Sequence, residues 1–219
     1  MHRVFHPSSN IIARVTIFGG LIIIAGICWV VYAVGTSSYV TEVAVPRSQP
    51  VPFSHQHHVS GLGLDCRYCH TTVETSAFAG IPPTATCMNC HSQIWTDSPM
   101  LQPVRDSYRT GVPLVWNRVN NLPQFAYFNH SIHINKGVGC STCHGRVDRM
   151  PLTWEEQPME MQWCLECHRN PNKVLRPRDQ VFNMEWQAPT DQVTKGAELA
   201  NSYHIRDTHY LTSCSTCHR

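Results

Sequence analysis

The sequence has little charge and almost no lysine. Asp, Glu, Lys and Arg make up 15% of the 219 residues, and the formal net charge is +2. Proteins that bind nucleic acid through a dense basic surface need a larger positive excess, so this class is excluded. The hydrophobic content of 42% likewise excludes disorder of the highly charged, weakly hydrophobic type.

Long apolar runs are absent except for one uncharged stretch, residues 15–34. As a helix this stretch would span about 30 Å, the thickness of the hydrocarbon core of a bilayer. A cleaved signal sequence is the alternative, because residues 33–35 are small. A signal's apolar core has about 7–15 residues, fewer than here. We therefore predict a retained single-pass transmembrane helix.

The residues flanking this stretch predict its orientation. Arg3 and Arg14 precede it without any acidic residue, so by the positive-inside rule residues 1–14 are expected in the cytoplasm. Trp29 and Tyr32 lie near its other end, where aromatic rings settle among lipid headgroups. The rest of the chain is then expected on the extracytoplasmic side of the membrane, with residues 35–51 as a linker.

Cysteine and histidine are abundant, with 11 and 14 copies. Ten of the cysteines form five Cys-x-x-Cys-His motifs, at residues 66–70, 87–91, 140–144, 164–168 and 214–218. The remaining one, Cys28, lies in the apolar stretch and is expected to pack as a small apolar residue. Composition alone would give roughly 0.03 such motifs, so their number is not accidental.

The motif has a specific chemistry. A disulfide framework would not place histidine after every pair, a zinc site would collect four ligands from two pairs, and a dithiol redox motif does not recur five times. Two thiols three positions apart can each form a thioether to a porphyrin vinyl group, and the next histidine binds the iron from the proximal side. We predict five covalently bound haem c groups, attached to Cys66, Cys69, Cys87, Cys90, Cys140, Cys143, Cys164, Cys167, Cys214 and Cys217, with His70, His91, His144, His168 and His218 as proximal ligands.

An internal repeat suggests the distal ligands. Phe-x-His-x-x-His occurs at residues 53–58 and 128–133, each copy being followed by two haem motifs. This predicts two modules, 53–91 and 128–168, and a single-haem unit, 203–219, within an extracytoplasmic domain 52–219. The repeated histidines, His55, His58, His130 and His133, are the predicted distal ligands, whereas His57 is expected at the surface. For the fifth distal position the candidates are His204, His209, Met150 and Met161.

The expected fold is mainly irregular with short α-helices. A domain of this size has a thin core, so the macrocycles themselves are expected to form it. A helix is predicted near residues 191–203, and the prolines in 92–124 favour irregular structure there. Strands have little support. Arginine suits carboxylates, so four arginines beside the motifs are candidate partners for haem propionates: Arg67, Arg146, Arg149 and Arg169.

With these motifs in place, the chain resembles the pentahaem cytochrome c subunit of bacterial alternative complex III, which has cytochrome c7- or c3-like modules. The stretches that carry the resemblance are 55–70, 128–145 and 161–169. It implies a place on the extracytoplasmic face of a quinol-oxidising membrane complex. There the subunit would take electrons from an iron–sulfur subunit and pass them towards a monohaem cytochrome c, a copper protein or a terminal oxidase. A separate quinol-binding membrane subunit is also implied.

We therefore predict an electron-transfer subunit in the bacterial cytoplasmic membrane, without catalytic residues of its own. Two alternatives remain. A single-anchored quinol dehydrogenase of the NapC and NrfH type would oxidise quinol at a haem near the bilayer, but residues 35–65 separate the apolar stretch from the first motif. A multihaem reductase would need an iron with an open face, and none of the three lysines stands in a motif that would supply its ligand.

Overall fold

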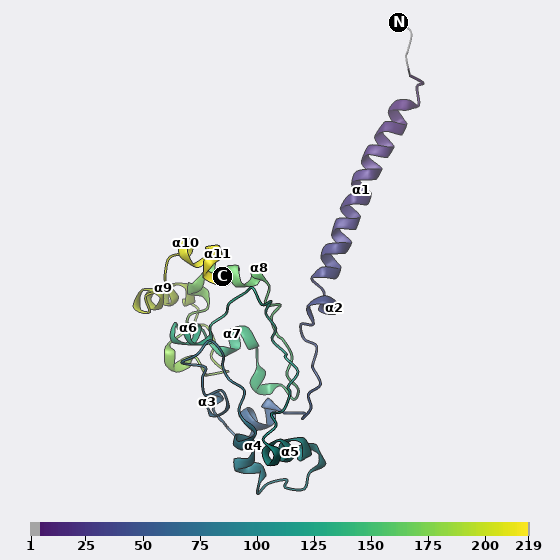
Figure 1. Cartoon of the computed structure of the whole chain (residues 1–219). Coiled ribbons are helices and arrows are strands. Elements are labelled where there is room, and N and C mark those ends of the chain that lie inside the picture. The colour runs from purple at the N-terminus through teal and green to yellow at the C-terminus, as the bar shows by residue number, and fades with distance from the viewer. Residues whose placement is uncertain (1–4, 219) are drawn as a thin grey trace. The chain divides into compact units, whose positions relative to one another are not determined.

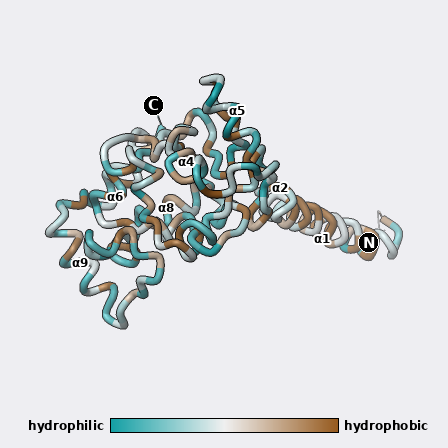
Figure 2. The backbone as a smooth tube through the Cα atoms, turned by 90° about the horizontal axis from the view of Figure 1, so that it is seen from below, coloured by the Kyte–Doolittle hydropathy of each residue, from teal (hydrophilic) through white to brown (hydrophobic). Residues whose placement is uncertain are grey.

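The computed structural model describes residues 5–218 and divides into two compact units at Glu42 and Val43 (Figure 1). The first unit holds α1 (Ser9–Gly35) and the short α2 (Ser38–Thr41). α1 is long and apolar enough to cross a membrane, a property that a signal sequence shares, and Figure 2 shows the hydrophobic residues along it. It begins before the predicted 15–34. Part of the predicted segment 1–14, including Arg3, lies outside the described residues.

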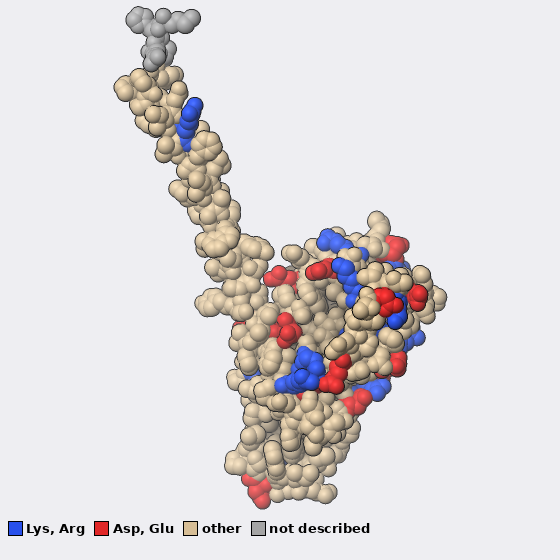
Figure 3. Space-filling model, turned by 180° about the vertical axis from the view of Figure 1, so that it is seen from behind, with Lys and Arg blue, Asp and Glu red and all other residues tan. Residues whose placement is uncertain are grey.

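Charge is distributed differently on the two units. The one charged residue in α1 is Arg14, whereas acidic and basic side chains are spread over the second unit (Figure 3). No side chain of α1 is buried within the protein. Bare apolar side chains around the whole helix are what a lipid environment stabilises.

The second unit consists of short helices joined by irregular segments. The α-helices are α3 (Cys66–Cys69), α4 (Thr84–His91), α5 (Gln102–Thr110), α6 (His130–Asn135), α7 (Cys140–His144), α8 (Met161–Arg169), α9 (Gln192–Ser202), α10 (Thr208–Leu211) and α11 (Cys214–Cys217). A π-helix, η1 (Gln56–Gly61), and four 3₁₀ turns complete them: η2 (Pro99–Leu101), η3 (Val147–Arg149), η4 (Pro171–Lys173) and η5 (Arg178–Gln180). Within residues 5–218, β structure is limited to three isolated bridges. The predicted fold class is confirmed.

The helix predicted near residues 191–203 is α9. The expectation of irregular structure throughout 92–124 was wrong, because α5 lies there. Pro103 stands in the first turn of α5, where a missing N–H costs nothing, and Val104 and Ser107 bury one face of the helix. Pro103 is therefore part of a helix start rather than a sign of irregular structure.

The apolar core is small. Only nine hydrophobic side chains in the described chain are buried. Some of them form two clusters, one around Leu101 and Val104, the other around Val73, Ile134 and Val181. A unit of this length normally buries a much larger fraction of its surface. The polypeptide supplies little apolar core of its own, as the sequence predicts for a chain that packs around large apolar groups.

Residues 43–51, predicted as part of a linker, belong to the packed second unit. Val51 is buried beside Leu101 and Val104, and the Ala44 N–H donates to the Glu155 carbonyl at 2.8 Å. The Gln49 side-chain amide donates to the Asn117 carbonyl at 2.8 Å. These contacts fix the entry of the chain into the unit.

Candidate haem-binding sites

Each Cys-x-x-Cys-His motif lies on or at the end of a short helix. We number them as sites 1 to 5 in sequence order, on α3, α4, α7, α8 and α11. In a helix, residues i and i+3 share a face, so the two thiols of each motif lie side by side. This arrangement suits attachment to neighbouring positions on one edge of a porphyrin.

The histidines of four motifs each face a histidine from the Phe-x-His-x-x-His repeats. The ring centroids are 6.5 Å apart for His55 and His70, 6.2 Å for His58 and His91, 6.4 Å for His130 and His144, and 6.2 Å for His133 and His168. Two imidazole nitrogens that bind one metal ion each lie about 2 Å from it, which separates the ring centroids by roughly 6 Å. The donor sets of sites 1 to 4 thus fit an iron with two axial histidines.

Hydrogen bonds on the far side of the rings favour the same assignment. Seven histidines of the five sites have Nδ1 at 2.7 to 3.1 Å from a backbone carbonyl oxygen. They are His58, His70, His91, His130, His133, His168 and His218. A carbonyl only accepts, so each Nδ1 carries the proton and donates. The Nε2 lone pair is then left for a metal, the usual arrangement behind metal-bound histidine.

Burial lowers the pKa of four histidines at these sites and so keeps their imidazoles neutral. It lowers the pKa of His144 to about 4, with a further contribution from His130, and it lowers the pKa of His55 to about 4, helped by His70. Burial also lowers the pKa of His58 and His133. A neutral ring has the free lone pair that ligation requires, so no proton need be displaced at physiological pH.

The two repeats have nearly the same local geometry. Phe53 lies at 90° to His55 and at 25° to His58, and Phe128 takes the same angles to His130 and His133. In each repeat the phenylalanine thus contacts both imidazoles, edge-on to the first and stacked on the second. This explains why Phe recurs at that position.

Two of the imidazoles are anchored across the repeats. Nδ1 of His130 in the second module donates to the Ala77 carbonyl of the first, at 2.8 Å. In return, Nδ1 of His55 in the first module is 3.0 Å from the Thr153 hydroxyl of the second. Sequence reasoning missed both anchors, since a backbone carbonyl and a lone threonine leave no pattern.

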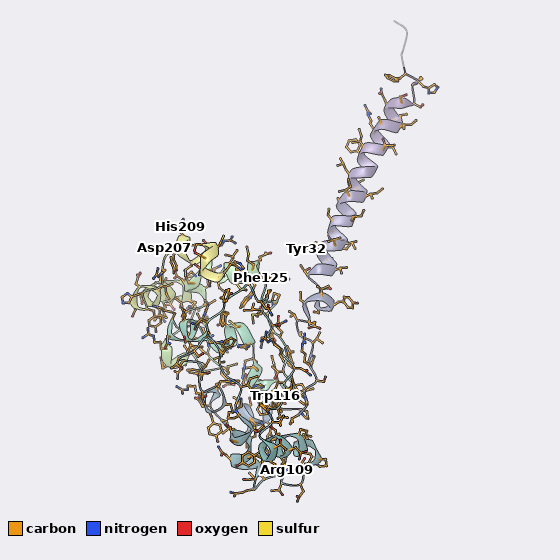
Figure 4. The ribbon with its side chains drawn as sticks, viewed as in Figure 1. Tyr32, Arg109, Trp116, Phe125, Asp207 and His209 are labelled. Atoms are coloured by element: carbon orange, nitrogen blue, oxygen red, sulfur yellow. The ribbon has the colours of Figure 1, made fainter. Side chains whose placement is uncertain are left out.

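At site 5 the ring next to His218 is that of Phe125, 5.8 Å away, and the Phe125 carbonyl accepts the Nδ1–H. His209 and Phe125 lie at the same end of the second unit, opposite Arg109 and Trp116 (Figure 4). His204 and His209 are exposed, as is Met161 with 65% of its surface, whereas Met150 is 1% exposed and accepts from the Gln56 N–H. The fifth distal ligand stays a prediction among these four.

Neighbouring motifs give the sites a spatial order that differs from their sequence order. The Cys66 and Cys140 thiols are close enough to shift each other's pKa, which makes sites 1 and 3 neighbours. Further cysteine neighbours join site 1 to 2, 3 to 4, and 4 to 5: Cys69 and Cys87, Cys143 and Cys167, Cys164 and Cys217. The helices accordingly run α4, α3, α7, α8, α11 along the unit (Figure 1). The order in space is 2, 1, 3, 4, 5.

Most of the predicted propionate partners already have carboxylate partners within the chain. Arg67 pairs with Asp65 at 2.8 Å, Arg146 with Asp148 at 2.6 Å, and Arg149 with Glu185 at 2.9 Å. Arg169 lines a surface cavity beside Asn170 and Asp207. Their role toward haem stays a prediction.

Cysteine pairs each followed by a histidine, facing imidazoles and a thin apolar core together fit a multihaem c-type cytochrome. Residues 132–219 match the cytochrome c3 family. Over 149 residues the chain is 31% identical to the multihaem cytochrome c subunit of menaquinone reductase from Nitratidesulfovibrio vulgaris, an alignment that spans 58% of this chain and 71% of the relative. The chain belongs to this family of cytochrome c3-like multihaem cytochromes c, and it binds haem c.

Proposed function

We propose that the protein is a membrane-anchored pentahaem cytochrome c that relays electrons within a quinone-linked membrane complex. The observation that carries the proposal is the set of four facing histidine pairs. When bound, haem c supplies one-electron Fe(III)/Fe(II) exchange. An iron held by two histidines has no open face for a substrate, so relay rather than catalysis is the function that these sites support.

The residues have separate tasks in this proposal. The ten motif cysteines attach the macrocycles, and the motif histidines hold the irons from the proximal side. His55, His58, His130 and His133 close the distal faces of sites 1, 2, 3 and 4. The carbonyls behind the rings fix their tautomer and orientation, which keeps the geometry constant between oxidation states.

The spatial order of the motifs assigns sites 2 and 5 to the two ends of the relay. Cys90 of site 2 and Cys214 of site 5 are both exposed, whereas the thiols of sites 1 and 3 are partly covered. Partners are therefore expected to exchange electrons at sites 2 and 5, with sites 1, 3 and 4 connecting them.

α1 and the relative support a proposal for the membrane location and the partners. α1 is proposed to anchor the chain in the bacterial cytoplasmic membrane with the haem unit on the extracytoplasmic side, where haem c is attached. The relative's name places it in a menaquinone reductase, which supports assembly of this chain into a quinone-linked complex. An iron–sulfur subunit, a quinol-binding membrane subunit and a monohaem cytochrome c are the proposed partners, as in alternative complex III.

The test is a ligand-resolved spectrum of the purified full-length protein. Intact mass should show five haems, and near-infrared magnetic circular dichroism should show low-spin iron with bis-histidine ligation at four of them. Carbon monoxide should leave those four unchanged. A mass equivalent to fewer than five haems would contradict the pentahaem assignment.

The same preparation separates the alternatives. Reduction of the isolated protein by a quinol analogue would favour a quinol dehydrogenase. A high-spin iron that turns over nitrite or a sulfur oxide would favour a reductase. The relay predicts neither, while the reassembled complex should reduce the haems with quinol.

A further inference from the structure

Arg176 differs from the other arginines near the sites because it is buried without a carboxylate. Its residue is 3% exposed, and no acidic side chain in the described chain pairs with it. Its Nε is buried and has no hydrogen-bond partner among the described residues. A buried, uncompensated cation is costly, so such a group usually has a partner or a task.

The Arg176 guanidinium lies between site 3 and the segment 180–186, where its further contacts include the Gln180 carbonyl at 3.5 Å. One Nη donates to the Ser141 and Thr142 hydroxyls at 3.1 and 3.2 Å, and these are the two residues between the motif cysteines. The other donates to the Asn183 carbonyl at 3.3 Å, and the Trp186 ring lies 4.3 Å from the guanidinium carbon. All of these partners are neutral, so they position the charge without cancelling it.

The backbone of the motif makes room for this group. A side chain at Gly139, the residue before Cys140, would collide with the Arg176 guanidinium. At Gly137 a side chain would collide with the Arg176 carbonyl and the Tyr203 ring. Gly139 thus lets the guanidinium lie against the start of α7, and Gly137 lets the Arg176 backbone lie beside the preceding turn.

The position of the charge relative to a haem follows from covalent chemistry. Cys140 and Cys143 attach to the vinyl edge of a macrocycle, and the propionates leave from the opposite edge. Arg176 lies at the vinyl edge, so its charge is not there to bind the propionates of site 3. Ferric haem with two neutral histidines carries one more positive charge in its core than ferrous haem. A fixed cation nearby therefore disfavours the oxidised state.

We propose that Arg176 is a potential-tuning residue, whose buried positive charge raises the reduction potential of the haem at site 3. The inference rests on the proposed haem at that site. Burial lowers the pKa of Arg176, but arginine starts so high that it stays charged. Site 3 is the middle position of the spatial order, so this residue would set the potential at the centre of the relay.

Two kinds of variant test the charge in the full-length protein. Arg176→Gln removes it, and Ser141→Asp neutralises it in place, because the Ser141 hydroxyl is 3.1 Å from the guanidinium. Ser141→Asn is the isosteric neutral control, Arg176→Lys keeps the charge, and Arg178→Gln removes an exposed arginine nearby. Intact mass reports the number of haems, and a potentiometric titration monitored by visible and EPR spectra reports each midpoint.

The expected result is that Arg176→Gln and Ser141→Asp both lower the midpoint of one haem, with five haems retained and the other midpoints unchanged. Ser141→Asn, Arg176→Lys and Arg178→Gln should leave all midpoints near the wild-type values. If Arg176→Gln loses a haem, Arg176→Met replaces it, since it fills similar space without the charge and should lower the same midpoint.

Unchanged midpoints in Ser141→Asp would overturn the proposal, as would a shift in Arg176→Lys equal to that in Arg176→Gln, which would indicate geometry rather than charge. Failure of the proposed function looks different. It would appear as a wild-type mass without haem on Cys140 and Cys143, before any variant is titrated.

Discussion

The two repeated modules agree in the geometry of their first histidine pair and differ in that of their second. His55 with His70 and His130 with His144 have nearly parallel ring planes, 12° and 2° apart. The second pairs diverge: His133 and His168 are 22° apart, whereas His58 and His91 are 68° apart. The first histidine pair of each module therefore has the same ring geometry, whereas the second pair differs between the modules.

The difference begins in the helix that carries the distal histidines. In the second module these residues start a regular α-helix, α6, whose first turn is capped by the Asn129 side chain. In the first module the equivalent residues run into a π-helix, η1, and π-turns are often found at functional sites. There His57, which has no counterpart in the second repeat, lies 5.9 Å from the Trp95 ring, and Trp95 in turn lies 6.3 Å from His91. The histidine pair with the large interplanar angle, His58 and His91, is thus the one with additional aromatic rings beside it.

The largest expected difference between the modules follows from removing a distal histidine. His133→Ala should convert the iron of site 4 from low-spin to high-spin and allow it to bind carbon monoxide, because within residues 5–218 no ring contact joins His133 to another imidazole of its own repeat. His58→Ala should give a smaller high-spin fraction, since the His57 ring is 5.4 Å from His58 and can replace it. Magnetic circular dichroism with and without carbon monoxide measures both.

The double variant His57→Ala with His58→Ala is the matched control, and it should behave like His133→Ala. Equal high-spin fractions in the His58 and His133 single variants would show that His57 plays no part.

A smaller difference should appear in the untouched protein. Nearly parallel axial imidazoles separate the two iron dπ orbitals in energy, whereas nearly perpendicular ones leave them close together. Sites 1, 3 and 4 should therefore give rhombic low-spin ferric EPR signals, and site 2 a strongly anisotropic signal with a large maximum g value. EPR of the oxidised protein, compared with the His57 and His58 double variant, assigns that signal. Its persistence in the double variant would refute the assignment to site 2.

The smallest effect concerns the helix start. Asn129→Ala removes the side chain that accepts from the Ile132 N–H at 3.3 Å, and loss of such a cap costs about 1 kcal/mol of unfolding free energy. Ser54→Ala removes the equivalent contact to the His57 N–H, at 3.1 Å, and should cost less because η1 is not a regular α-helix. Thermal unfolding of the oxidised proteins compares them. Asn129→Asp keeps an acceptor and should unfold like wild type; a loss as large as that of Asn129→Ala would argue against capping.

The sequence predicted the parts of the sites that repeat, and missed the parts that depend on distant packing. Regular spacing gave the cysteine pairs and the four distal histidines, which the structure brings opposite motif histidines, although their role as ligands stays a prediction. It did not say which distal histidine faces which motif, since histidines three apart can point to different partners. Arg176 was overlooked because it lies outside every motif and its contacts to Ser141 and Thr142 come from the fold. The α5 helix was missed because Pro103 resembles a breaker until the helix start is known.

The reciprocal anchoring of His55 by Thr153 and of His130 by Ala77 means that the duplication no longer consists of two separable halves. A fragment cut between them would leave one axial ring in each piece free to rotate. The halves should thus be inherited, expressed and matured together. Exchanging one half with that of a related cytochrome should succeed only when the residue that anchors its histidine in the other half is transferred as well.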